Sequence, residues 1–250
     1  GAKPTVADAD LDAARQRAML RRAVRFADAV VVPSHAMAAE LVEFAPLHGR
    51  VRVIAGAPPE GYRAPSDAPS RARRMQLPER YVAVIGRVAD SQPLTSALRA
   101  ALSVDVEVVV IGAGHSDRAR IAEVVNSNVD IAATVHAPAL HDPADRAVVL
   151  SRALVVVDAS AAPIFPWLTL EALAVGAPVI AARTAQNEEL LADGAHLIAI
   201  DDEDALSEAL RRLTDDAQVA ERLRVLAMDR SRAYSWRDAA ERVWQLHSEL

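Results

Sequence analysis

From residue 79 onward, short apolar segments alternate with stretches that have the periodicity of helices. The segments typical of strands cover 81–85, 106–111, 131–135, 154–157, 178–182 and 196–200. The helical stretches cover 94–102, 117–126, 143–152, 167–175, 186–192, 203–212, 217–229 and 235–250. Because the strand segments contain few polar residues, they predict a parallel sheet covered on both faces. We therefore expect a doubly wound α/β domain over residues 79–232, with ligands bound beyond the carboxyl ends of its strands.

A proline-rich segment precedes this pattern. Between residues 58 and 78 lie Pro58, Pro59, Gly61, Pro65, Pro69 and Pro78. Such a composition predicts a linker. Residues 1–57 show only a helix at 11–26, a strand at 29–33, a helix at 36–44 and a strand at 51–54. This β-α-β fragment is too small to cover an apolar strand on both faces, so we expect the remnant of an N-terminal lobe. The last segment, 233–250, is expected to pack back toward that remnant.

Charge and composition exclude several classes of function. The 250-residue chain has a net charge of −6, and most of the acid lies after the linker. Residues 79–250 hold 16 basic against 26 acidic side chains, which argues against nucleic-acid binding. Without cysteine there is no disulfide framework, thiolate nucleophile or cysteine-ligated zinc. No apolar run reaches the roughly 20 residues that span a bilayer, and we expect a cytoplasmic protein.

Two loops at the expected ligand edge contain glycine. Gly86 and Arg87 follow the first strand, where a glycine allows the turn and an arginine can reach a phosphate. The simpler interpretation is a turn glycine beside a solvated arginine. After the second strand, Gly112, Gly114 and His115 resemble a phosphate-binding turn without the third glycine of the dinucleotide fingerprint. His115 is expected to contact ligand or water rather than act as a base.

The loop at 159–166 leads into the helix at 167–175, and Pro166 suits a helix start. The first turn of this helix would present amide donors to an anion. Glu171, one turn further on, taken alone is an ordinary helical carboxylate. We predict no metal site, because the histidines at 136 and 141 lack a carboxylate at ligand spacing. The nucleophile elbow and zinc-protease motifs are also absent.

Taken together, these segments resemble the retaining glycosyltransferases of family 4, also described as glycosyl transferases group 1. The matching stretches are ADAVVVPSHAMAAELV (27–42), RVRVI (50–54), LPERYVAVIGRV (77–88), VVVIGAG (108–114), FPWLTLEALAVGAPVIA (165–181), DDEDALSEALRRLTDD (201–216) and YSWRDAAERV (234–243). The family has the GT-B architecture of two facing Rossmann-like lobes. The resemblance implies that most of this chain is the C-terminal lobe, which binds the nucleotide-sugar donor.

The resemblance also implies roles for individual residues. Arg87 matches an arginine that binds the donor diphosphate, and Gly86, Gly112, Gly114 and His115 lie in the matching loops. Glu171 matches the second glutamate of the Glu-x7-Glu motif, which holds the ribose hydroxyls. The helix start at Trp167 and Leu168 would supply amide donors to phosphate oxygens. Fixed positive groups of this kind assist departure of the diphosphate, and family members need no metal or other cofactor for it.

Four features depart from the family pattern, one of which is Ala55-Gly56-Ala57 in place of the family's Asn-Gly after the strand before the linker. The first glutamate of the motif is Pro163, and the glycine after it is Ile164. The lysine expected five positions after Arg87 is Gln92. The loss of one such cation can lower the rate by roughly 10²–10³, by analogy with oxyanion-hole donors.

Two functions therefore stay open. The first is a divergent glycosyltransferase that transfers a hexosyl group with retention to an unknown acceptor. The chain alone is expected to be inactive, because it lacks the acceptor-side lobe or a protein partner. The second is a degenerate lobe that binds a nucleotide or a partner as a structural or regulatory subunit. An unrelated Rossmann nucleotide binder built on Gly112 and Gly114 is a minor third. The arginine-rich helix at 11–26 is a solvated face or a contact with an anionic membrane.

Overall fold

The computed structural model describes residues 6–44, 47, 49–86, 91–112, 135–138, 140, 142–160, 165–199 and 201–250. The chain forms two compact units. One comprises Gly1–Ala55 with Ala239–Leu250, and the other comprises Gly56–Asp238.

The smaller unit contains a short parallel β-α-β motif. Its elements are α1 (Val6–Phe26), β1 (Val30–Val32), α2 (His35–Phe44), β2 (Val51–Val53) and most of α11 (Trp236–Glu249). The two strands pair in parallel, and buried Val24 and Leu47 form a small core beside them. The helices and strands expected from the sequence of this unit are thus confirmed. No helix in the described part of the chain is long and apolar enough to cross a membrane.

The larger unit is built on a six-stranded parallel sheet. Its strands are β3 (Tyr81–Gly86), β4 (Glu107–Gly112), β5 (Val135–His136), β6 (Val155–Asp158), β7 (Val179–Ala182) and β8 (His196–Ile198). Their order in the sheet is β5-β4-β3-β6-β7-β8. The chain enters at β3, builds outward through β4 and β5, and then crosses to the other side at β6. This arrangement confirms the doubly wound α/β fold and places a topological switch point between β3 and β6.

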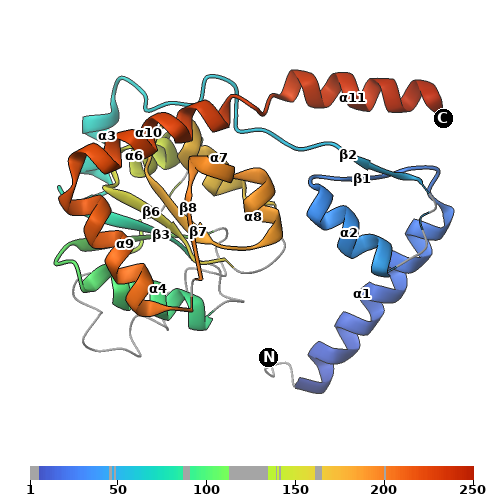
Figure 1. Ribbon diagram of the computed structural model, residues 1–250, viewed down its shortest axis with the longest axis horizontal. Coiled ribbons are helices and arrows are strands. Elements are labelled where there is room, and N and C mark those ends of the chain that lie inside the picture. Colours follow the sequence, from blue (N-terminus) through green and yellow to red (C-terminus); the bar gives the residue numbers. More distant parts are fainter. Residues whose placement is uncertain are drawn as a thin grey trace. The chain divides into compact units, whose positions relative to one another are not determined.

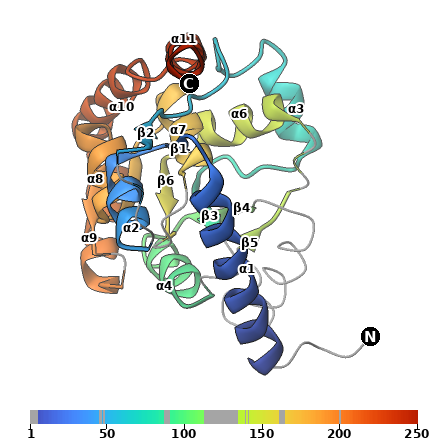
Figure 2. The same cartoon turned by 90° about the vertical axis from the view of Figure 1, so that its right-hand side faces the viewer.

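Helices cover both faces of this sheet, as Figures 1 and 2 show. On one face α4 (Ser91–Leu102) and α9 (Glu203–Asp215) pack together over β3, β4, β6 and β7, with Leu98 and Leu210 in the shared core. On the other face lie α6 (Pro143–Arg152) and α7 (Trp167–Ala174). The remaining elements are α8 (Ala185–Leu190), the 3-10 helix η3 (Ala192–Gly194) and α10 (Ala217–Ser231).

The proline-rich segment contains a helix that the sequence pattern does not predict. Helix α3 (Ala68–Arg74) begins after Asp67 and has a proline in its first turn. Arg71 on this helix bonds to Asp142 and Asp145 at the start of α6. These bonds attach the segment to the larger unit. The helix expected at 117–126 and the first part of the strand expected at 131–135 lie outside the described residues.

Candidate functional site

The switch point brings the ends of β3, β4 and β6 together. Gly86 ends β3 and pairs with Gly112 of β4, while Ile85 pairs with Asp158 at the end of β6. Gly86 has a packing reason to be glycine, since a Cβ there would lie 2.8 Å from a methyl group of Leu94. In doubly wound sheets this is the place where ligands bind. The two glycines predicted from the sequence therefore lie side by side at the expected edge.

Several predicted site residues lie outside the described part of the chain. They are Arg87, Gly114 and His115, together with Pro163 and Ile164 of the altered motif. Gln92 lies in α4, but its side chain is likewise not described. The described part of the site comprises the strand ends, α6, α7 and Tyr62.

Helix α7 begins at this edge. Its N-cap, Pro166, has no side-chain group that can accept from the first turn. The Trp167 amide donates to the carbonyl of Phe165 at 2.9 Å, and the Leu170 amide makes the first helical bond, to Pro166, at 2.9 Å. The amides of Leu168 and Thr169 belong to the first turn, which has no acceptor within the helix. The start of α7 thus has the donors and the dipole end that suit an anion.

The Trp167 side chain belongs to an aromatic cluster. It meets Phe165 edge to face with ring centroids 4.5 Å apart, and it stacks on Trp236 at 5.7 Å. Gly56 lies against the same ring, since a Cβ there would be 2.9 Å from Cζ3. The indole thus joins α7 to the segments that begin and end the larger unit. Its sequence neighbours give no signal of this packing.

A buried acid at the end of β6 is a site feature that sequence reasoning missed. Asp158 accepts from the hydroxyl of Thr169 on α7 and from the amide of Ser160 at 2.9 Å. Both Asp158 and Thr169 are buried. The contact fixes the start of α7 against the switch point. An acid that ends an otherwise apolar strand is the signal that would have pointed to it.

Glu171 is buried in α7 and is held by side chains from two other segments. Arg146 of α6 donates through Nε to Oε2 at 2.9 Å and through Nη2 to Oε1 at 2.7 Å. The Tyr62 hydroxyl donates to Oε2 at 2.8 Å. Glu171 was predicted from the sequence, whereas Arg146 and Tyr62 were not. Residues 25 and 109 positions away along the chain leave no periodic signal.

Tyr62 and Arg146, the two partners of Glu171, both have raised pKa values and therefore keep the protons that they donate. Burial, followed by the Glu171 charge, raises the pKa of the Tyr62 hydroxyl far above its ordinary value. The hydrogen bond to Glu171 raises the pKa of Arg146 despite its partial burial. At neutral pH the carboxylate therefore faces a neutral hydroxyl and a charged guanidinium.

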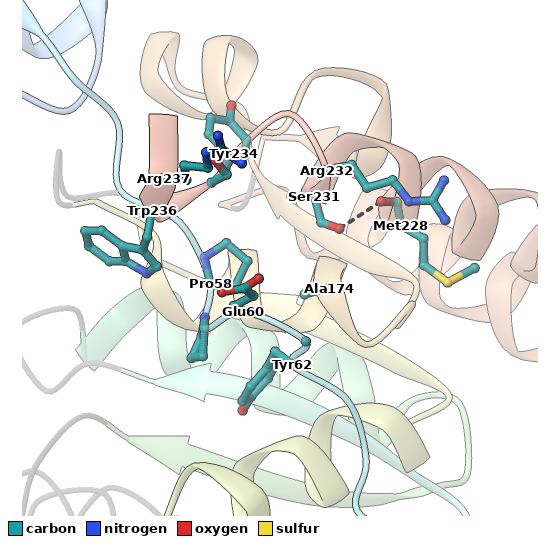
Figure 3. A pocket seen from close by; sticks show the side chains of 13 residues that line it. Pro58, Glu60, Tyr62, Ala174, Met228, Ser231, Arg232, Tyr234, Trp236 and Arg237 are labelled. Carbon is teal, nitrogen blue, oxygen red and sulfur yellow. Dashed lines mark hydrogen bonds between the residues drawn. The ribbon is translucent and has the colours of Figure 1, made fainter. Parts of the chain in front are cut away.

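Tyr62 also lines a pocket of about 490 Å³, and Figure 3 shows the residues around it. Residues 58–62 form one wall, 228–237 form another, and Ala174 at the end of α7 completes it. The Tyr62 ring borders the pocket while its hydroxyl bonds to Glu171. Nothing in the sequence pattern predicted this pocket. Among the described residues no three His, Cys, Asp or Glu side chains gather as a metal site would require.

Comparison with known proteins decides the family. The family described as glycosyl transferases group 1 matches residues 79–216, more than half of the chain. The chain belongs to this family. Among curated proteins none matches it.

Solved structures agree with this assignment at the level of the fold. Sucrose-phosphate synthase from Thermosynechococcus elongatus superposes with a TM-score of 0.75 at 24% identity, over 94% of this chain and 60% of that one. Anabaena HepE, solved with UDP and glucose, superposes at 0.79 with 20% identity, over 94% of this chain and 67% of that one. A C-terminal domain of a group 1 protein, LpcC from Francisella tularensis, superposes at 0.58 with 17% identity, over 71% and 97%. The larger unit is thus a Rossmann-like lobe of the GT-B fold.

Proposed function

We propose that this chain supplies the donor-binding lobe of a glycosyltransferase that takes a hexosyl group from a nucleotide-diphosphate sugar and transfers it with retention. The observation that carries the proposal is the switch point, where Ile85 of β3 pairs with Asp158 of β6 and α7 begins. The structure of HepE with UDP and glucose supports a nucleotide-sugar donor for this fold. The chain spans 60% of the length of the sucrose-phosphate synthase. The proposal therefore names neither the acceptor nor the residues that bind it.

In this proposal, the start of α7 and Arg87 bind the diphosphate. As the bond between the sugar and the diphosphate breaks, negative charge grows on the phosphate oxygens. The amides of the first turn of α7 and the helix dipole are fixed before the reaction and therefore need no reorientation. Arg87, the residue after Gly86, would add a full positive charge. Asp158 turns its carboxylate toward Thr169 and Ser160, so its charge is engaged by donors of the protein.

Glu171 completes the proposed donor site as the acceptor for the ribose hydroxyls. We further propose that residues 1–57 belong to the acceptor-side lobe, that 58–78 link the lobes, and that 79–232 bind the donor. Gly112, Gly114 and His115 would border the donor on the side of β4.

Calorimetry with UDP, GDP, ADP and their glucose conjugates tests this proposal. We expect one nucleotide to bind and Arg87→Ala to weaken it by about 10- to 100-fold, because an ion pair to a phosphate is lost. Arg80→Ala is the matched control, because Arg80 is exposed and precedes β3, at the amino end of the strand and away from the proposed site. Absence of binding by any nucleotide, or equal effects of the two variants, would overturn the proposal.

A further inference from the structure

The carboxylate proposed to hold the ribose already has a nearly full set of hydrogen bonds. The Glu171 side chain is 7% exposed and accepts from Arg146 at both oxygens and from Tyr62 at Oε2. A carboxylate offers about four lone-pair sites, so three of them are used. A bound ribose must therefore share or replace these donors.

The geometry of the guanidinium makes replacement the expected outcome. Arg146 engages Glu171 through two parallel N–H···O bonds, one to each oxygen. A ribose diol presents two neighbouring hydroxyl donors and would approach a carboxylate in the same two-pronged way. The guanidinium and the diol cannot both donate to the same lone pairs of the two Glu171 oxygens at once.

We propose that Arg146 and Tyr62 form a cap on Glu171 that the nucleotide ribose displaces when the donor binds. The inference rests on the proposed function, because it takes Glu171 as the ribose acceptor. Tyr62 and Arg146 are positioning residues in this account: they hold the empty carboxylate and compete with the diol. The affinity for the donor is then lowered by the strength of the cap.

Tyr62 is the more easily displaced member. It makes one neutral hydrogen bond to Glu171, and its hydroxyl also lies 3.1 Å from the carbonyl of Pro143. After displacement it keeps an acceptor, so no buried hydroxyl is left without a partner. The Arg146 side chain is 29% exposed and can turn toward water. Exchange of the cap for a diol therefore leaves no charge buried and unpaired.

Displacement of Tyr62 also affects the segment that carries it. Residues 58–62 form a wall of the pocket in Figure 3 and follow Gly56, where the larger unit begins. Their backbone has neither helix nor strand in residues 58 and 59 and only a turn at 60 and 61. Donor binding would thus change the contacts of residues 58–62, close to the start of the larger unit.

The test compares UDP with 2′,3′-dideoxyuridine diphosphate, which lacks the diol, by calorimetry on the full chain. Tyr62→Phe removes only the competing hydroxyl and is expected to tighten UDP binding about three- to tenfold while leaving the dideoxy analogue unchanged. Arg146→Lys, which cannot form the fork, is expected to act in the same direction. Tyr234→Phe is the matched control, because its half-buried hydroxyl bonds elsewhere, to the carbonyl of Leu190.

The outcomes separate the two proposals. If UDP binds but Tyr62→Phe weakens it, or changes both ligands alike, the cap is overturned and the donor site stands. If GDP or ADP binds in place of UDP, the same comparison is made with the corresponding dideoxy analogue. If no nucleotide binds to the wild type or to either variant, the proposed function falls and the cap with it. Circular dichroism of each variant confirms that it is folded.

Discussion

The Arg71 guanidinium lies 2.9 Å from the carboxylate of Asp145 and joins α3 to α6. Asp145 is 1% exposed, and Arg74 reaches the same carboxylate oxygen at 2.7 Å. Arg71 also bonds to Asp67, the residue just before its own helix, and to Asp142. A segment whose composition is typical of a linker is therefore held in place by one buried acid and two arginines.

Asp145→Ala is expected to lower the free energy of unfolding by about 3 kcal/mol, because it removes a buried charge from between two cations. Urea denaturation measures the change, and limited proteolysis should show cleavage within 58–78. Asp67→Ala is the control, since its side chain is 54% exposed and bonds to the same arginine. It should cost less than about 1 kcal/mol. Equal losses would contradict the central role of Asp145.

Gly56→Ala is expected to destabilise the larger unit by about 1–3 kcal/mol, because the new Cβ would overlap the Trp167 ring. Thermal unfolding measures the effect, and the change in tryptophan fluorescence reports the stacking of Trp167 on Trp236. Combining Gly56→Ala with Trp167→Leu provides room for the methyl group. The double variant should then show much less than the sum of the two single losses. Additive losses would mean that Gly56 is required for another reason.

The sheet and its order follow from patterns that the sequence displays. Apolar runs such as 81–85 and 106–111 can be stable only when helices cover both faces, and the structure shows this. Helix α3 was not predicted because Arg71 on it bonds to Asp142 and Asp145, which lie 71 and 74 residues further along the chain. The cap on Glu171 escaped prediction for the same reason. Periodicity reports burial on one element, whereas ion pairs between elements depend on tertiary packing.

Thr169→Val is expected to cost about 1–3 kcal/mol, since it removes a donor from the buried carboxylate of Asp158. The start of α7 should also lose its fixed position, so nucleotide affinity should fall together with stability. Urea denaturation and calorimetry measure the two effects. Thr214→Val, whose hydroxyl bonds only within and next to α9, should leave nucleotide affinity unchanged. A Thr169→Val protein with unaltered affinity would show that this contact does not position the donor site.

The stability of the larger unit should depend on the charge of Asp142. The Asp145 amide, and after it the Arg71 guanidinium, hold the pKa of Asp142 below its usual value of 3.8. The folded state thus favours the charged form, and this stabilisation is present above the unfolded pKa and lost as pH falls through the folded pKa. Asp142→Asn keeps the helix cap without the charge. Urea titrations from pH 7 to pH 3 should show that the difference between wild type and variant shrinks below about pH 4.

Glu208→Gln is the control for this titration, because Glu208 is exposed in the middle of α9. The free energy of unfolding of this variant should differ little from that of the wild type. A constant difference between wild type and Asp142→Asn across this range would show that the ion pair with Arg71 adds no stability.

Hydrogen exchange with and without the tightest-binding nucleotide among UDP, GDP and ADP tests the placement of the donor site most directly. We expect slower exchange in the first turn of α7, at residues 167–170, and at the end of β3 near Gly86. Residues at the amino ends of the strands, such as His196 at the start of β8, should exchange at unchanged rates. Unchanged exchange in α7, or protection confined to the amino ends of the strands, would show that the nucleotide does not bind at the start of α7.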